Sequence, residues 1–249
     1  MTPDAALVAA LLRDGSFRSC IERSGEEISS AYVAGDFHFR SLTLASGPRL
    51  VIAVGKDGCG WQGQAARVLI YERAQGGYRL VLSSVSLPER VAATPDGTLN
   101  LAAHETANAI VQATYVWNGA RYAFSPEHSS IYCVGPQRDN ERPYDLPIHF
   151  ARGTSSIVLR GTAFENCGQD YSFVARAGQR VTIERLTPEP PGLRIPIFLD
   201  FRDDSIADVS GLRWSGTLRR SGRYTLNVFG TDQRGDVGLQ PFTIRLTIR

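Results

Sequence analysis

The residues best suited to binding chemistry form a short cationic turn near the end of the chain. They are Arg220, Ser221, Gly222, Arg223 and Tyr224, which follow Arg219 in the same turn. A guanidinium can bind a carboxylate through two parallel hydrogen bonds, and a serine hydroxyl can donate to the same group. A glycine lets the backbone approach another molecule closely, and a tyrosine adds an amphipathic contact unless it only packs in its own sheet. With Arg234 in the following loop, the turn is predicted to dock on an acidic site of a partner. The alternative is that Ser-Gly only makes a good turn.

The catalytic motifs in the chain are each incomplete. Gly58 to Gly63 matches GxGxxG after an apolar strand, but a dinucleotide site needs a helix and then an acidic residue about 20 positions further on. Residues 65–71 read as a strand instead, and Ser83 occupies the acidic position. His104-Glu105 starts like HExxH without the second histidine, and no serine lies in a GxSxG elbow. We therefore expect no catalytic residue, no metal, no cofactor and no enzyme activity.

One acidic cluster has residue types that could hold Ca²⁺ or hydrolyse a glycosidic bond. Its members are Asp200, Asp203, Asp204 and Asp208. Paired carboxylates serve glycoside hydrolysis and carboxylate oxygens bind Ca²⁺, but the spacing and glycine of an EF-hand loop are absent. Three arginines lie close in sequence and would neutralise the cluster: Arg194, Arg202 and Arg213. The cluster is predicted to be a solvated loop with local ion pairs, with a calcium site as the alternative.

Aromatic residues could form a platform on which sugar rings stack. The candidates are Trp61, Trp117, Trp214, Tyr32, Tyr132 and Tyr144. In β proteins most aromatic side chains pack in a core or against a neighbouring strand. We therefore expect these residues to pack within the protein rather than to bind a glycan.

The elements that must position these residues are strands, apart from one short helix. Residues 5–12 are apolar, follow Thr-Pro-Asp and precede a glycine, which predicts a helix. Tyr224, Leu226 and Val228 alternate with polar residues, and the same alternation runs from Phe242 to Ile248. Such alternation places one set of side chains in a core and the other in water. The pattern predicts an all-β fold: an N-terminal antiparallel meander or propeller-like domain with one short helix, followed by a C-terminal β-sandwich.

Two stretches in the first half of the chain look alike. Gly76-Gly77 joins two apolar strands in one stretch, and Asn118-Gly119 joins two in the other. Both dipeptides favour hairpin turns because they tolerate positive φ. A polar segment bounded by prolines, residues 135–143, then precedes a further run of short strands. The predicted domains are residues 1–135, with a duplicated hairpin unit, and residues 148–249, the sandwich.

The composition limits the classes of partner. Of 249 residues, 43% are hydrophobic and 21% charged, with a formal net charge of +2, which supports a packed core and argues against disorder. Acidic and basic residues are interspersed, unlike the basic stripe of a nucleic-acid binder. No segment approaches the ~20 apolar residues of a membrane span. We expect a protein partner and neither nucleic acid nor a membrane span. Because no secretory leader is recognisable, an exported protein would be represented here by its mature part.

The cysteines bear on the compartment in which the protein works. Cys20, Cys59, Cys133 and Cys167 are spread along the chain, and none pairs with another cysteine or a histidine at a metal-binding interval. Such a dispersed, even set favours two disulfides in an oxidising compartment over buried free thiols. Of the three possible connectivities we predict sequential pairing, Cys20–Cys59 and Cys133–Cys167.

Several short stretches after residue 148 occur in a recognisable order. They are His149 to Ser156, Leu159-Arg160-Gly161, Gln169-Asp170-Tyr171, Ala175 to Gln179, Trp214 to Leu218, Ser221 to Tyr224 and Phe242-Thr243-Ile244. In this order and spacing they resemble the periplasmic inhibitors of g-type lysozyme, which are small bacterial β proteins. The pre-peptidase C-terminal domains of secreted enzymes share the Ser-Gly-x-Tyr ending and are the related alternative. Residues 230–237 are more acidic and richer in glycine than the corresponding loop of the inhibitors, so another muramidase is an alternative target.

The resemblance implies a periplasmic inhibitor of a lysozyme or other muramidase, acting in host defence or as immunity to a secreted peptidoglycan hydrolase. The turn around Ser221, with Arg220, Arg223 and Arg234, would then enter the active cleft, where such enzymes carry a catalytic carboxylate pair. The alternative function is a non-catalytic module that binds glycan or peptidoglycan, or an accessory domain of a secreted hydrolase.

Overall fold

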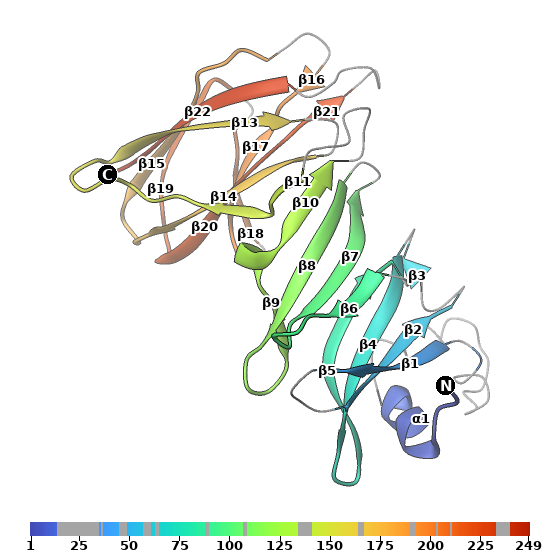
Figure 1. Cartoon of the computed structure of the whole chain (residues 1–249). Helices are drawn as coiled ribbons and strands as arrows, with labels where there is room; N and C mark the ends of the chain where they lie inside the picture. Colours follow the sequence, from blue (N-terminus) through green and yellow to red (C-terminus); the bar gives the residue numbers. More distant parts are fainter. Residues whose placement is uncertain are drawn as a thin grey trace. The chain divides into compact units, whose positions relative to one another are not determined.

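The computed structural model of the protein describes most of the chain. The described residues are 1–13, 35, 37–44, 49–56, 61–62, 65–87, 90–106, 109–133, 141–163, 167–189, 193–202, 204–209, 211–232 and 240–249. The chain divides into two compact units, residues 1–104 with 112–125 and residues 105–111 with 126–249. Strands fill both units in Figure 1, and this confirms the predicted all-β fold. No helix within these described ranges is long and apolar enough to cross a membrane.

The first unit begins with the helix α1 (Ala5–Leu12), which has the bounds that the sequence predicted. Asp4 caps it, because its carboxylate accepts a hydrogen bond from the backbone N–H of Leu7 at 2.8 Å. This bond satisfies one of the N–H groups that a helix start leaves unpaired. The apolar face of α1, including Leu7 and Leu11, packs against strand residues such as Phe37.

An antiparallel sheet carries this helix on one of its faces. Its strand order is β1-β2-β4-β3, with β5 paired to β4. The strands are β1 (Phe37–Thr43), β2 (Arg49–Gly55), β3 (Trp61–Gln62), β4 (Ala65–Ala74) and β5 (Gly77–Ser86). In β2 the residues from Leu50 to Gly55 are all buried. Val51 faces the cluster that contains α1, whereas Ile52 faces a second apolar cluster, so this strand is covered on both sides.

The next sheet contains the Asn118-Gly119 hairpin. Its strands in this part of the chain are β6 (Val91–Ala93), β7 (Leu99–Thr106), β8 (Ala109–Trp117) and β9 (Tyr122–Phe124). Gly119 has a φ of 95°, and the Asn118 side-chain oxygen accepts bonds from the backbone N–H groups two and three residues further on. Gly76 and Gly77 also have positive φ at the β4–β5 turn. Both hairpins form where the turn residues predicted them.

The second unit contains the hairpin end of β7 and β8, residues 105–111, and two short strands. These strands are β10 (Ser130–Cys133) and β11 (Glu141–Pro143), which pair antiparallel. Cys133 at the end of β10 forms a disulfide with Cys167, with 5.7 Å between their Cα atoms. This bridge confirms one of the two predicted pairs. Cys20 and Cys59 lie outside the described residues.

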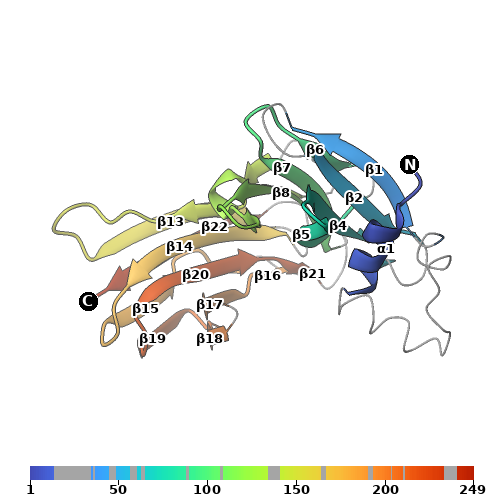
Figure 2. The same ribbon diagram turned by 90° about the horizontal axis from the view of Figure 1, so that it is seen from below.

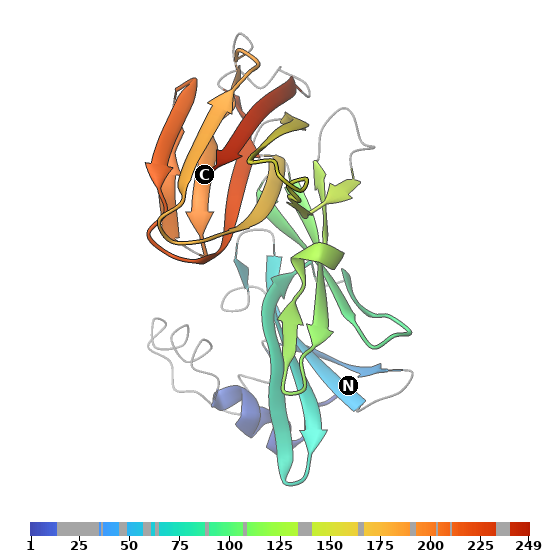
Figure 3. The same ribbon diagram turned by 90° about the vertical axis from the view of Figure 1, so that its left-hand side faces the viewer.

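The remainder of the second unit is the predicted β-sandwich, shown from two further directions in Figures 2 and 3. One sheet has the order β12-β14-β20-β17-β18, and the other has the order β13-β22-β15-β19. The strands of the first sheet are β12 (Asp145–Pro147), β14 (Gly168–Ala175), β20 (Gly222–Phe229), β17 (Ile197–Phe201) and β18 (Asp204–Asp208). Those of the second sheet are β13 (Ser156–Ala163), β22 (Gln240–Ile248), β15 (Arg180–Arg185) and β19 (Arg213–Thr217). A separate ribbon pairs β16 (Leu193–Arg194) with β21 (Thr231–Asp232).

The core of the sandwich follows the predicted alternation. In β20 the buried residues are Tyr224, Leu226 and Val228, and in β22 the buried set runs alternately from Phe242 to Ile248. These side chains belong to a single apolar cluster that draws on both sheets. A sandwich of this kind gives a rigid base to the loops that leave it.

One side of the sandwich is open. Strands β18 and β19 are the last strands of their sheets, so each has a backbone edge without a partner strand in the described part of the chain. They are also consecutive in sequence, so the chain crosses from one sheet to the other at this side. The predicted binding turn follows β19 directly and therefore lies beside this open side.

Candidate functional site

The predicted binding turn connects β19 to β20. We use the name arginine turn for residues 219–223. Its base is Leu218, which is buried and tied to the neighbouring β14–β15 turn: the Leu218 N–H donates to the Gln179 carbonyl at 2.9 Å, and the Gly178 N–H donates to the Leu218 carbonyl at 2.8 Å. Arg219, Arg220 and Ser221 are exposed. The turn thus projects into solvent from a fixed base.

Tyr224 holds the arginine turn from inside. Its side chain is 1% exposed, and its ring stacks on Phe173 and tilts against Phe201, with centroid distances of 5.7 and 4.8 Å. Its hydroxyl donates to the backbone carbonyl of Arg220 at 2.7 Å. The sequence left two roles open for this ring, contact with a partner or packing in its own sheet, and the structure places it in the core of the sandwich. Its contacts make it a support for the turn.

Ser221 and Gly222 shape the tip of the turn. The Ser221 Oγ accepts a hydrogen bond from the backbone N–H of Ala177 at 2.9 Å. Gly222 has a φ of 149°, and a Cβ at this position would lie 3.0 Å from Cε2 of Phe201. Both the backbone conformation and the aromatic ring beneath it therefore require a glycine here.

Two arginines of the turn form ion pairs with carboxylates on the outer strands. Arg220 binds Asp204 of β18 at 2.7 Å, with both side chains exposed, and its guanidinium lies 5.4 Å from the Phe201 ring centroid. Arg223 binds Asp145 of β12, where the arginine is 50% exposed and the carboxylate 7%. The other oxygen of that carboxylate is buried without a hydrogen-bond partner among the described residues. Arg223 is therefore the counter-charge of a nearly buried acid, whereas the Arg220 pair lies at the surface.

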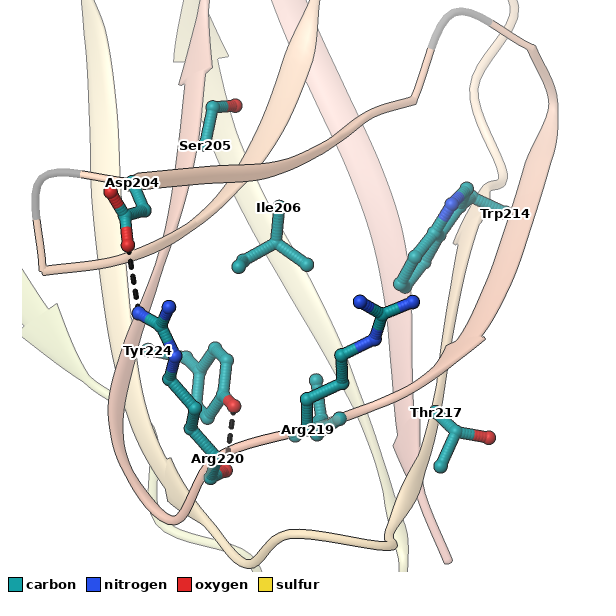
Figure 4. A pocket seen from close by; sticks show the side chains of 9 residues that line it. Asp204, Ser205, Ile206, Trp214, Thr217, Arg219, Arg220 and Tyr224 are labelled. Carbon is teal, nitrogen blue, oxygen red and sulfur yellow. Dashed lines mark hydrogen bonds and ion pairs between the residues drawn. The ribbon is translucent and has the colours of Figure 1, made fainter.

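A groove of about 730 Å³ lies beside the arginine turn, at the open side of the sandwich. Its lining residues are Asp204, Ser205, Ile206, Trp214, Thr217, Leu218, Arg219, Arg220 and Tyr224. In Figure 4 the guanidinium of Arg219 lies beside the Trp214 ring, and Ile206 faces both from β18. The sequence placed Arg219 in the turn without assigning it to binding, and it treated Trp214 as a packing residue. Gly216 follows Trp214 by two positions and lies on the same face of β19. A glycine at this position is the sequence feature that could have indicated an aromatic ring packed over the strand backbone.

The acidic cluster does not form a metal site in the described residues. No group of three or more His, Cys, Asp or Glu side chains comes together there, and Asp203 lies outside the described part of the chain. Asp204 pairs with Arg220, and burial is the main cause that raises the pKa of Asp200. The Arg202 guanidinium lies over the Phe201 ring at 5.5 Å from its centroid.

The other sequence motifs have structural explanations where they are described. Strand β4 follows the GxGxxG segment at the place where a dinucleotide site needs a helix. Trp117 packs edge-on against Tyr122, with 5.2 Å between ring centroids, and the Arg79 guanidinium lies 5.6 Å from the Trp117 ring. Arg234, Tyr32 and residues 57–60 lie outside the described residues.

Comparisons with known proteins find similar solved structures for part of the chain. No protein-family model and no curated protein matches the sequence. Among solved structures, PliG of Aeromonas hydrophila, a periplasmic lysozyme inhibitor of g-type lysozyme, is similar at 23% identity and a TM-score of 0.35, over 42% of this chain and 96% of PliG. PliG of Salmonella Typhimurium is similar at 23% identity and a TM-score of 0.36, over 42% and 97% of the two chains.

A third similar structure is the pre-peptidase C-terminal domain of collagenase from Bacillus anthracis. Its identity is 15% and its TM-score 0.30, over 44% of this chain and 100% of that domain. Both groups that the sequence stretches resemble are therefore among the similar solved structures.

Proposed function

We propose that the protein is a periplasmic inhibitor of a lysozyme or another muramidase, which enters the active cleft of that enzyme with its arginine turn and catalyses no reaction itself. The observation that carries the proposal is the fixed exposure of this turn. Ser221 and the flanking arginines face solvent, while Tyr224 and Leu218 hold the backbone from beneath. The ordered stretches that resemble the inhibitors of g-type lysozyme support the same assignment.

The turn presents hydrogen-bond donors suited to the carboxylate pair of a muramidase cleft. Ser221 accepts a bond from Ala177, which leaves its hydroxyl proton for an acceptor on the enzyme. Arg223 is half exposed and uses only part of its guanidinium on Asp145, so its remaining N–H groups are available for a second carboxylate.

Arg220 can change its partner at small cost. Its ion pair with Asp204 is exposed on both sides, and such pairs contribute only about 0–1 kcal/mol. A carboxylate held in a cleft that excludes water is a stronger partner than one in solvent. Arg220 is therefore expected to exchange Asp204 for an acid of the enzyme when the complex forms.

Two properties of the whole chain fit this role. The Cys133–Cys167 disulfide is typical of proteins that work in an oxidising compartment such as the periplasm. The formal net charge of +2 is too small for long-range steering to dominate association. Tight inhibition would therefore depend on the fit of the turn and on slow dissociation.

An assay of cell-wall lysis tests the proposal. The purified protein is mixed with lysozymes of different families, and the loss of turbidity of a bacterial wall suspension is recorded. We expect at least one enzyme to be inhibited, and Ser221→Ala to weaken that inhibition by roughly 10- to 100-fold, because one hydrogen bond to a charged group contributes roughly 1.5–3 kcal/mol.

The control is Ser83→Ala, which removes an exposed serine from β5 in the first unit. It should leave the inhibition unchanged, and thermal unfolding should show that both variants are folded. Undiminished lysis with every lysozyme would remove the proposed function. Unchanged potency in folded Ser221→Ala would remove the arginine turn as the binding element.

A further inference from the structure

The groove between β18 and β19 contains a cation that no described residue neutralises. Arg219 is exposed, and within the described residues its side chain has no ion pair or hydrogen bond. Its neighbours Arg220 and Arg223 are both paired with carboxylates. Arg219 is thus the arginine of the turn whose five N–H donors remain open to a ligand.

The aromatic wall of the groove is held in a fixed position. The Trp214 side chain extends from β19 and packs partly against the sandwich core. A Cβ built on Gly216 would lie 2.5 Å from Cζ2 and 2.6 Å from Cη2 of Trp214, so the indole lies over the backbone of its own strand where only a glycine leaves room. Figure 4 shows this ring beside the Arg219 guanidinium. The groove therefore offers a positioned aromatic surface next to an unpaired cation.

The chemistry of the lining selects the class of ligand. A guanidinium prefers a carboxylate, and an aromatic surface beside it prefers a flat apolar face on the same molecule. Ile206 of β18 extends the apolar wall. The volume of about 730 Å³ lies within the range of small-molecule sites, roughly 300–1,000 Å³. These features fit an acidic sugar, in which a ring with an apolar face carries a carboxylate.

An added peptide strand fits this side of the sandwich less well. Strand β18 has five residues, with Asp204 and Asp208 at its ends, and its pairing with β17 is irregular at Leu199–Asp200. Short length, charge and bulges are the features by which edge strands resist pairing with another chain. The backbone edge of β18 is thus unsuited to pairing with another strand. This favours a ligand that binds to the side chains of the groove.

We propose that the groove between β18 and β19 binds an acidic saccharide, with Trp214 stacked on a sugar ring and Arg219 bound to its carboxylate. Gly216 is a positioning residue, since it lets the indole lie in place. The inference goes beyond the inhibition of a muramidase and does not depend on it, because it concerns a small ligand in the absence of any enzyme.

The test is a binding titration of the full chain with two disaccharides of equal ring number. N-acetylglucosaminyl-N-acetylmuramic acid carries a carboxylate, and di-N-acetylchitobiose does not. Binding is followed by calorimetry and by tryptophan fluorescence, with Trp214→Phe to identify the signal. We expect the acidic disaccharide to bind at least about tenfold more tightly, which corresponds to one charge-assisted contact of roughly 1.4 kcal/mol.

Four variants separate the parts of the proposal. Arg219→Gln should abolish the preference for the acidic disaccharide, and Arg219→Lys should keep part of it. Gly216→Val should weaken both disaccharides by displacing the ring, with thermal unfolding as the check on folding. The matched control is Arg213→Gln. It removes an exposed arginine of β19 that does not line the groove, and it should leave binding unchanged.

Several results would overturn the inference. They are failure of the acidic disaccharide to bind, equal affinity for the two disaccharides, and an equal loss in Arg213→Gln and Arg219→Gln. Tighter binding of a glutamate-rich peptide than of the acidic disaccharide, lost in Arg219→Gln, would make the groove a peptide site and would also overturn it. Saccharide binding without inhibition of any lysozyme would support this inference and remove only the proposed function.

Discussion

At the scale of single residues, the arginine turn combines exposed donors with a buried support. Tyr224 lies in the core and donates its hydroxyl to the Arg220 carbonyl at 2.7 Å, so the backbone of the turn depends on a buried side chain. Loss of the donor to this partly buried bond costs free energy unless water replaces it. The position of Arg220 and Ser221 is thus linked to one buried hydroxyl.

Tyr224→Phe should reveal this link. The variant keeps the ring stacked on Phe173 but removes the donor to Arg220, so the free energy of unfolding should fall by about 1 kcal/mol. If the arginine turn is the inhibitory element, potency should fall as well, because the backbone at Arg220 is less well held. Urea unfolding and the wall-lysis assay measure the two effects. A loss of stability equal to that of Tyr224→Ala, which removes the ring and should cost roughly 3–5 kcal/mol, would contradict this division of roles.

At the scale of elements, each unit is held together by side chains that connect one element to the next. In the first unit Asp4 caps α1 and also accepts a hydrogen bond from the hydroxyl of Tyr78 on β5 at 2.9 Å. The Leu7 N–H and the Tyr78 hydroxyl hold the pKa of Asp4 below its usual value. In the second unit the Tyr171 hydroxyl on β14 donates to the Arg160 carbonyl on β13 at 3.0 Å, which joins the two sheets of the sandwich.

The contribution of Asp4 should depend on pH. Because the pKa of this carboxyl is lowered in the folded protein, its ionised form stabilises the fold above the unfolded pKa of about 3.9, and this contribution is lost as pH falls through the folded value. Asp4→Ala should lower the free energy of unfolding by about 1 kcal/mol at pH 7. Urea unfolding between pH 7 and pH 2 should show a smaller acid loss for Asp4→Asn than for the wild type. The control is Asp208→Asn, an exposed acid on β18, and acid losses that are the same in all three proteins would refute the prediction.

At the scale of the whole molecule, contacts distant in sequence close the second unit. The disulfide links β10 to the residue before β14 across a sequence separation of 34, and the Arg142 guanidinium donates to the Cys133 sulfur and to the Thr162 carbonyl. Asp145 meets Arg223 across 78 positions. The residues before position 148 thus supply both a covalent link and a buried counter-charge to the sandwich.

Removing the disulfide should affect the second unit selectively. In the chain-entropy model a loop of this length contributes about 4 kcal/mol, so Cys133→Ser with Cys167→Ser should lower the stability of the sandwich by roughly 2–4 kcal/mol. Hydrogen exchange measures this by element, and we expect faster exchange in β14, β20 and β22 with little change in β1, β2 and β4. Uniform acceleration in both units would contradict a local effect of the bridge.

The sequence determined the features that depend on neighbouring residues. The helix at 5–12, the hairpins at Gly76-Gly77 and Asn118-Gly119 and the buried alternation in β20 and β22 all follow from periodicity and turn chemistry over a few residues. The same alternation placed Tyr224 with Leu226 and Val228 on the core face. The Cys133–Cys167 bridge agreed with sequential pairing, which the sequence favoured without excluding the other connectivities.

Only the tertiary structure decided which residues of the turn remain open to a ligand. Arg220 and Arg223 are paired because β18 and β12 bring Asp204 and Asp145 to them, and the groove that Arg219 and Trp214 line is open because β18 and β19 are the last strands of their sheets. Strand order arises from packing between segments far apart in the chain, and local patterns of polarity do not encode it. The physical reason is the sequence separation of the interacting residues. Turns and periodicity depend on residues a few positions apart, whereas ion pairs and grooves depend on which strands become neighbours in the fold.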